Sequence, residues 1–114
     1  MARIYLDQLR SLFQKMELTA LENMNLEFKH FFSGAAVYAD GKICMTLTPV
    51  GFAIKLSKPD IDSLLELKGN KRLRYFPNAP IKKDYVLLSD NILTHAESFS
   101  SLIRTSIEFV VEKS

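Results

Sequence analysis

The sequence contains a single cysteine, Cys44, and this scarcity excludes an internal disulfide. Cys44 lies in the apolar run Ile43–Met45, which is typical of a buried free thiol in a reducing compartment. No segment approaches the roughly 20 apolar residues that a membrane-spanning helix needs. Charge appears as early as Arg3 and Asp7, which is too early for a secretory signal. These absences predict a soluble, cytoplasmic protein with no membrane segment.

Motifs that carry catalysis or bind cofactors are also scarce. The two histidines, His30 and His95, have no cysteine, histidine or carboxylate partner at metal-ligand spacing. The four glycines are scattered and form no phosphate-binding loop, and no nucleophile turn of the G-x-S-x-G type occurs. Asp60 and Asp62 are typical of the first turn of a helix, not of an acid–base pair. We therefore expect no metal, no cofactor and no enzymatic activity.

Length and composition predict one ordinary globular domain over residues 1–114. A chain of 114 residues has room for one core. Hydrophobic residues make up 47% of it, which is enough to form that core without disulfides. The net charge of +2 is too small to indicate the kind of partner, so the distribution of charge matters more.

Hydrophobic periodicity predicts three helices. Apolar residues from Tyr5 to Met16 recur on one helical face, so a helix is expected over 3–16. A second helix is expected to begin at 57–60, where a proline and an acid suit the first turn, and to end before Gly69. The third is expected to follow Thr94-His95-Ala96-Glu97, which matches a capping box, and to continue to the end of the chain.

Shorter apolar segments between these helices predict strands. Segments 33–38 and 42–47 flank Asp40-Gly41, a dipeptide that suits the positive φ angles of a type I′ hairpin turn. With a third strand at 52–56 they form an antiparallel meander, because parallel neighbours would need long crossovers. Two more strands are expected at 72–76 and 84–88. The order helix, three strands, helix, two strands, helix predicts a two-layer α+β fold with helices packed on a mostly antiparallel sheet.

Basic residues are concentrated between Lys68 and Lys83, where no acidic residue occurs. The candidate partner-binding residues there are Lys68, Lys71, Arg72, Arg74, Tyr75, Phe76, Lys82 and Lys83. The favoured interpretation is a solvated sheet edge, which lysines protect from pairing with other chains. An acidic protein partner is the second, and a nucleic acid, whose phosphates and bases suit cations and aromatic rings, is the third. In a strand, Arg72, Arg74 and Phe76 would share one face, opposite Leu73 and Tyr75.

Aromatic and small residues precede the Asp40-Gly41 turn in a recognisable order. The residues that carry it are Phe32, Gly34, Tyr38, Asp40 and Gly41. This segment resembles the N-terminal domain of the TfoX (Sxy) family of bacterial competence regulators. Ser33 and Ala36 stand where the family has glycines, and Phe31 stands where it has methionine. Phe52–Lys55, Tyr85 and the last helix also occur in the order of the family.

The resemblance implies a fold similar to secretion chaperones, no known catalytic residues, and a domain standing alone without the family's C-terminal domain. We accordingly expect a non-catalytic regulatory or protein-binding domain, connected with transcription or competence. A nucleic-acid-binding module that uses residues 68–83 is the alternative. A homodimer is also expected, because a small sheet leaves a face or an edge for a partner, and folds of the implied kind often pair.

Overall fold

The computed structural model describes residues 3–15, 25–31, 34–74 and 78–112. Within these ranges the helices are α1 (Arg3–Lys15), α2 (Lys58–Leu65), α3 (Asp90–Leu93) and α4 (Ala96–Glu112). The strands are β1 (Leu26–Phe31), β2 (Gly34–Ala39), β3 (Lys42–Thr48), β4 (Gly51–Lys55), β5 (Lys71–Leu73) and β6 (Lys82–Leu87). The predicted α+β class is confirmed.

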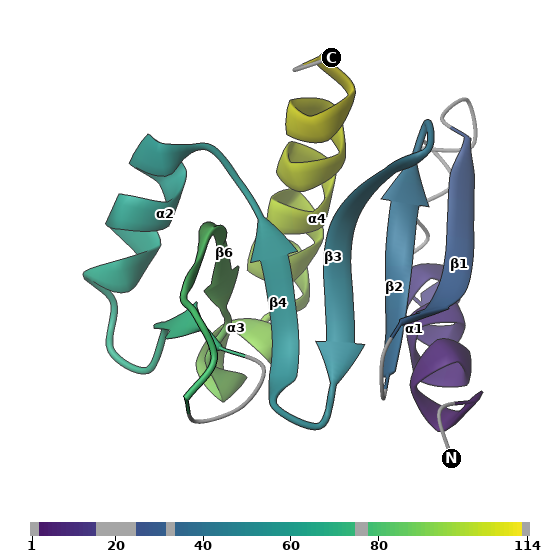
Figure 1. The fold of residues 1–114 in the computed structure, drawn as a ribbon, viewed down its shortest axis with the longest axis horizontal. Helices are drawn as coiled ribbons and strands as arrows, with labels where there is room; N and C mark the ends of the chain where they lie inside the picture. The colour runs from purple at the N-terminus through teal and green to yellow at the C-terminus, as the bar shows by residue number, and fades with distance from the viewer. Residues whose placement is uncertain (1–2, 16–24, 32–33, 75–77, 113–114) are drawn as a thin grey trace.

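The strands form one antiparallel sheet in the order β1-β2-β3-β4-β6-β5 (Figure 1). The first four follow the chain, as short connections require. The order changes only at β5, which lies outside β6 and pairs with it. Among the described strands, β1 and β5 therefore form the two edges of the sheet.

The long helices α1 and α4 pack on the same face of the sheet and lie behind it in the view of Figure 1. Helix α1 covers β1 and β2, and α4 covers β3 and β4. Helix α2 lies beside β6 and adds Ile61 to the same core. The periodic apolar residues of the helices face this sheet, as an amphipathic helix requires.

The core between the two layers is built on cross-strand neighbours. Val37, Met45, Ile54 and Val86 stand side by side on β2, β3, β4 and β6, and all four are fully buried. Aromatic side chains connect the helices to this row. The ring of Phe13 meets Phe28 edge to face at 5.1 Å, and Phe52 meets Phe99 in the same way at 4.9 Å.

The predicted Asp40-Gly41 turn and the predicted start of α2 are confirmed, and the structure adds a side-chain cap to α2. Asp40 and Gly41 have φ angles of 51° and 80°, as a type I′ turn between β2 and β3 requires. Ser57 caps α2 by accepting a hydrogen bond from the backbone N–H of Asp60, and a proline occupies the first turn.

A β-bulge at Cys44 joins the sheet to helix α4. Val37 pairs with Met45 and Tyr38 pairs with Ile43, which leaves Cys44 as the additional residue. The predicted buried thiol is confirmed, and its Sγ donates to the carbonyl of Val37 at 3.2 Å. The buried hydroxyl of Ser106 on α4 lies 3.0 Å from the carbonyl oxygen of Cys44 and 2.7 Å from that of Lys55, so it can donate to either.

The structure adds two elements to the predicted order and corrects one cap. Strand β1 precedes the meander, and the short helix α3 precedes α4. The predicted capping box is wrong, because Thr94 ends α3 and its hydroxyl donates to the carbonyls of Asp90 and Asn91. Helix α4 begins later, at Ala96. Of the predicted residues, Met16, Phe32 and Ser33 lie outside the described ranges.

Candidate functional site

The basic stretch lies on a hairpin at one edge of the sheet. Strand β5 pairs with β6 through Lys71↔Leu87, Arg72↔Val86 and Leu73↔Lys82. Its other edge faces no strand in the described part of the chain. Lys71 and Arg72 therefore lie on a sheet edge, the position that the sequence favoured for this stretch, whereas Lys82 and Lys83 lie on the neighbouring strand β6.

Asn70 fixes the start of this hairpin. Its side-chain amide donates to the carbonyl of Leu64 at the end of α2, at 2.8 Å. Its side-chain oxygen accepts from the backbone N–H of Ser89, just before α3, also at 2.8 Å. Since Asn70 is only 7% exposed, these bonds are shielded from water and hold β5 between two helices.

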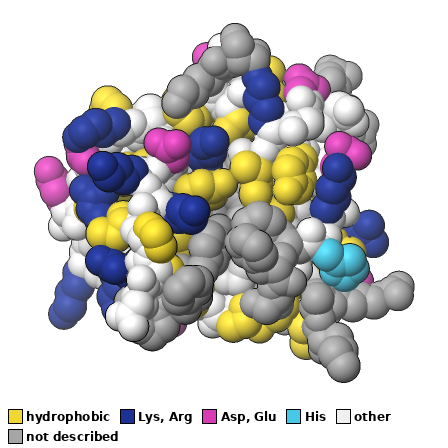
Figure 2. Space-filling model, in the orientation of Figure 1, with side chains coloured by type: hydrophobic (Ala, Val, Ile, Leu, Met, Phe, Trp, Pro, Cys, Tyr) yellow, Lys and Arg dark blue, Asp and Glu magenta, His cyan; other side chains and the backbone are white. Residues whose placement is uncertain are grey.

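All six basic residues of the stretch are exposed, and they lie on or beside the hairpin. They are Lys68 after α2, Lys71 and Arg72 on β5, Arg74 after β5, and Lys82 and Lys83 on β6. In Figure 2, Lys and Arg side chains gather on the side formed by α2 and this hairpin. Among the described residues none of the six forms an ion pair. Their charge is therefore available to a partner.

The predicted alternation of side chains along β5 is confirmed for Arg72 and Leu73. Leu73 is fully buried while Arg72 is exposed, so they point to opposite faces of the sheet. Arg74 differs from its neighbours, because its Nη1 donates to the carbonyl of Ala79 at 2.9 Å and closes the β5–β6 connection. Tyr75 and Phe76 lie outside the described residues.

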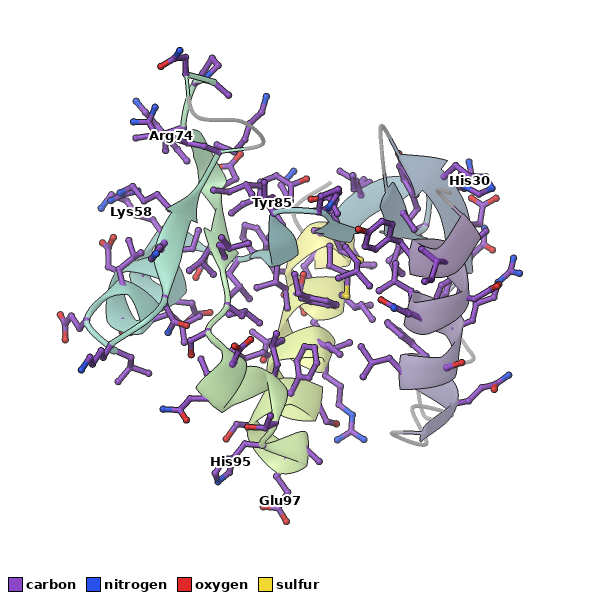
Figure 3. All side chains as sticks on the ribbon, turned by 90° about the horizontal axis from the view of Figure 1, so that it is seen from below. His30, Lys58, Arg74, Tyr85, His95 and Glu97 are labelled. Carbon is purple, nitrogen blue, oxygen red and sulfur yellow. The ribbon has the colours of Figure 1, made fainter. Side chains whose placement is uncertain are left out.

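A pocket of about 440 Å³ opens between α2 and this hairpin. Its lining residues are Lys58, Ile61, Asp62, Arg72, Ile81, Lys83 and Asp84. Lys58 Nζ donates to Asp62 Oδ2 at 2.8 Å, one turn along α2. The pocket thus places Arg72 and Lys83 beside a third cation and two apolar side chains. Figure 3 shows Lys58 and Arg74 on the same side of the molecule.

The contribution of α2 to this pocket was not predicted from the sequence. Lys58 and Asp62 are four residues apart, which is a helical ion-pair spacing and the one signal that the sequence offered. Nothing in the pattern placed this pair next to Arg72, because their proximity depends on how α2 packs on the sheet. Asp84, which ends the acid-free stretch, also enters the pocket.

Other reactive side chains lie away from this edge or are held inactive. His30 and His95 are exposed and far apart in Figure 3. Burial raises the pKa of the Cys44 thiol to about 12, so the thiolate needed for nucleophilic attack is not formed near neutral pH. Over the described ranges no group of three His, Cys, Asp or Glu side chains is placed to hold a metal ion, and no helix has both the length and the apolar character to cross a membrane.

The geometry of the hairpin and pocket is suited to binding: unpaired cations, an open strand edge and a partly apolar hollow. Comparisons of the chain with protein-family models, with curated proteins and with solved structures found no match.

Proposed function

We propose that this chain is a non-catalytic, protein-binding domain whose partner presents an acidic, extended segment to the β5–β6 hairpin. The observation that carries the proposal is the gathering of exposed cations without ion-pair partners along an open strand edge. The residues shared with the TfoX family support a regulatory role for such binding.

An extended acidic segment suits this surface for three physical reasons. An open strand edge offers backbone N–H and C=O groups to an added strand. Lys71 and Arg72 stand next to that edge, where carboxylates of an added strand would meet them. The pocket offers the exposed side chain of Ile81 to an apolar side chain of the same segment. Charge of one sign also speeds the encounter with an acidic partner.

A direct titration tests the proposal. The probe is a fluorescent peptide of alternating glutamate and apolar residues, and the readout is anisotropy at about 100 mM salt. We expect Lys71→Ala with Arg72→Ala to weaken binding at least tenfold, mainly through a slower association rate. The matched control is Arg10→Ala with Arg104→Ala, which removes the same charge from exposed positions on α1 and α4 and should leave binding unchanged.

Three outcomes contradict the proposal. One is no binding of the peptide, and another is an equal loss in both double variants, which would reflect net charge alone. The third is binding of a nucleic-acid oligonucleotide tighter than roughly 10⁻⁶ M at the same salt, since non-specific binding is weaker than that. That last result would establish the alternative, a nucleic-acid-binding module.

A further inference from the structure

The opposite edge of the sheet has different chemistry. Among the described strands β1 pairs only with β2, so it forms the other edge of the sheet, on the right of Figure 1. Its described positions read Leu26, Glu27, Phe28, Lys29 and His30, with one acid and one base placed symmetrically about Phe28. This edge carries both signs of charge, unlike β5.

One hydrogen bond fixes which backbone groups of β1 point outward. The backbone N–H of Asp40 donates to the carbonyl of Asn25 at 2.9 Å, so Asn25 and Asp40 form a hydrogen-bonded pair of the antiparallel ladder. Such pairs alternate along the strands, so Glu27 and Lys29 also bond toward β2. The N–H and C=O groups of Leu26, Phe28 and His30 therefore point away from the sheet.

These outward groups and the charges fit a second copy of the same strand. In an antiparallel pairing centred on Phe28, each Phe28 faces its counterpart, and Leu26 faces His30 of the second copy. Glu27 then faces Lys29 of the second copy at a position without backbone bonds, where opposite side chains are closest. Within one chain, Lys29 Nζ lies 3.7 Å from Glu27 Oε1. The side chains of Glu27 and Lys29 are 43% and 53% exposed, so both can reach a second copy.

We propose that two copies of this chain pair through their β1 strands, with Phe28 on the two-fold axis. The core face continues across the junction, because Phe28 already packs on Phe13 of α1. Because both copies use the same strand about a two-fold axis, the pairing ends at two copies and does not extend into a chain of molecules. The β5 edge is unsuitable for the same pairing, because it would bring Lys71 and Arg72 close to the same two cations of the second copy, with no carboxylate on either strand. The proposal does not depend on the function of the basic hairpin.

Charge reversal tests the interface through the mass measured by light scattering at micromolar concentration. We expect the unmodified chain to show about twice its mass of 13.0 kDa. Glu27→Lys and Lys29→Glu should each be monomeric, because each places like charges opposite one another. An equimolar mixture of the two variants should regain the double mass, because one copy is then basic at both positions and the other acidic at both.

The mixture separates contact between chains from effects within a chain. Each single variant also loses the ion pair between Glu27 and Lys29 of its own strand. Mixing cannot restore that internal pair, whereas it restores both pairs across the junction. A monomeric unmodified chain, or single variants that keep the double mass, would overturn the proposal, and so would a mixture of folded variants that stays monomeric.

A backbone variant gives a second, independent test. His30→Pro removes an N–H that points outward, so β1 keeps its bonds to β2 while the junction loses one bond from each copy, two in all. We expect a monomer with a far-UV spectrum like that of the parent, and a dissociation constant raised at least tenfold. Lys29→Pro is the matched control, because its N–H points inward and its loss should weaken the fold itself. A His30→Pro dimer of unchanged affinity would exclude the β1 edge as the interface.

Discussion

Gly34 has a steric reason to be glycine. A Cβ at this position would collide with the carbonyl oxygen of Leu47 and would lie 2.8 Å from Cα of Thr48. Because both atoms belong to the backbone of β3, they cannot turn aside as a side chain would. The close approach of β2 to β3 therefore depends on the missing side chain.

Gly34→Ala is expected to lower the free energy of unfolding by about 1–3 kcal/mol, because the added methyl group overpacks the sheet. Urea denaturation measures the change. The comparison variant is Gly41→Ala, whose Cβ would meet nothing within 4 Å and which therefore isolates the cost of a positive φ. If Gly34→Ala has the same urea midpoint as the parent, β2 and β3 can move apart without a loss of stability.

Cys44 gives the stability a dependence on alkaline pH. Its folded pKa of about 12 lies above the unfolded value of 9.0, because burial disfavours the thiolate. The folded state thus holds a proton that the unfolded state releases above pH 9.0. The contribution of this thiol is fully present at lower pH and is lost as the pH rises from 9.0 toward 12.

Urea denaturation at several pH values above 9.0 measures this effect. Ionisation of Cys44 should lower the free energy of unfolding by about 1.4 kcal/mol for each pH unit. Cys44→Ala should remove that part of the slope, although it also leaves a cavity, whose cost to stability does not depend on pH. If the free energy of unfolding falls equally with pH in the parent and the variant, the raised pKa of Cys44 is contradicted.

Among the elements, the β2–β3 hairpin depends most on its turn. Gly41→Val places a β-branched residue at a φ of 80°, which such residues strongly disfavour. We expect a loss of stability of about 1–3 kcal/mol. Thermal denaturation checks it, and a melting temperature unchanged within error would mean that the turn adapts to valine.

Elements with strong local signals could be predicted from the sequence. The apolar face of α1, the Asp40-Gly41 turn and the proline at the start of α2 all depend on neighbours in the chain. Strand β1 was missed because its burial is partial and its alternation mixes charges with aromatics, as an edge strand allows. Helix α3 is a single turn, which is too short for periodicity to be detected. Thr94 was assigned to the wrong helix because the helix before it was not expected.

Besides the apolar core, the buried hydroxyl of Ser106 connects α4 to the sheet. Ser106→Ala leaves the carbonyls of Cys44 and Lys55 without this donor, and we expect a loss of about 1–3 kcal/mol. Thr105→Ala is the matched control, because its hydroxyl donates within α4 to the carbonyl of Ser101 near the surface. Urea denaturation should separate the two variants. Equal losses would show that helix propensity, not the contact between layers, accounts for the effect.

At the scale of the whole molecule, the sequence could predict the charge of the candidate site but not its shape. The six cations of the stretch are close in the chain, so their clustering follows from local order. The pocket also needs Lys58 and Ile61, which reach it only because α2 packs beside β6. The placement of β5 outside β6 likewise depends on tertiary pairing, which no local pattern encodes.

That placement has a kinetic consequence. Because β5 pairs only with β6 among the described strands, it is attached to the rest of the sheet through β6 alone in this part of the chain. Release of β5 would expose one fully buried side chain, Leu73, whereas release of β3 or β4 would open the core. Amide protons of Lys71–Leu73 should consequently exchange with deuterium well before those of Met45 and Ile54, through an opening that leaves the rest of the sheet intact. Strand β5, with its exposed Lys71 and Arg72, is therefore a part of the sheet that can detach and re-form while the molecule remains folded.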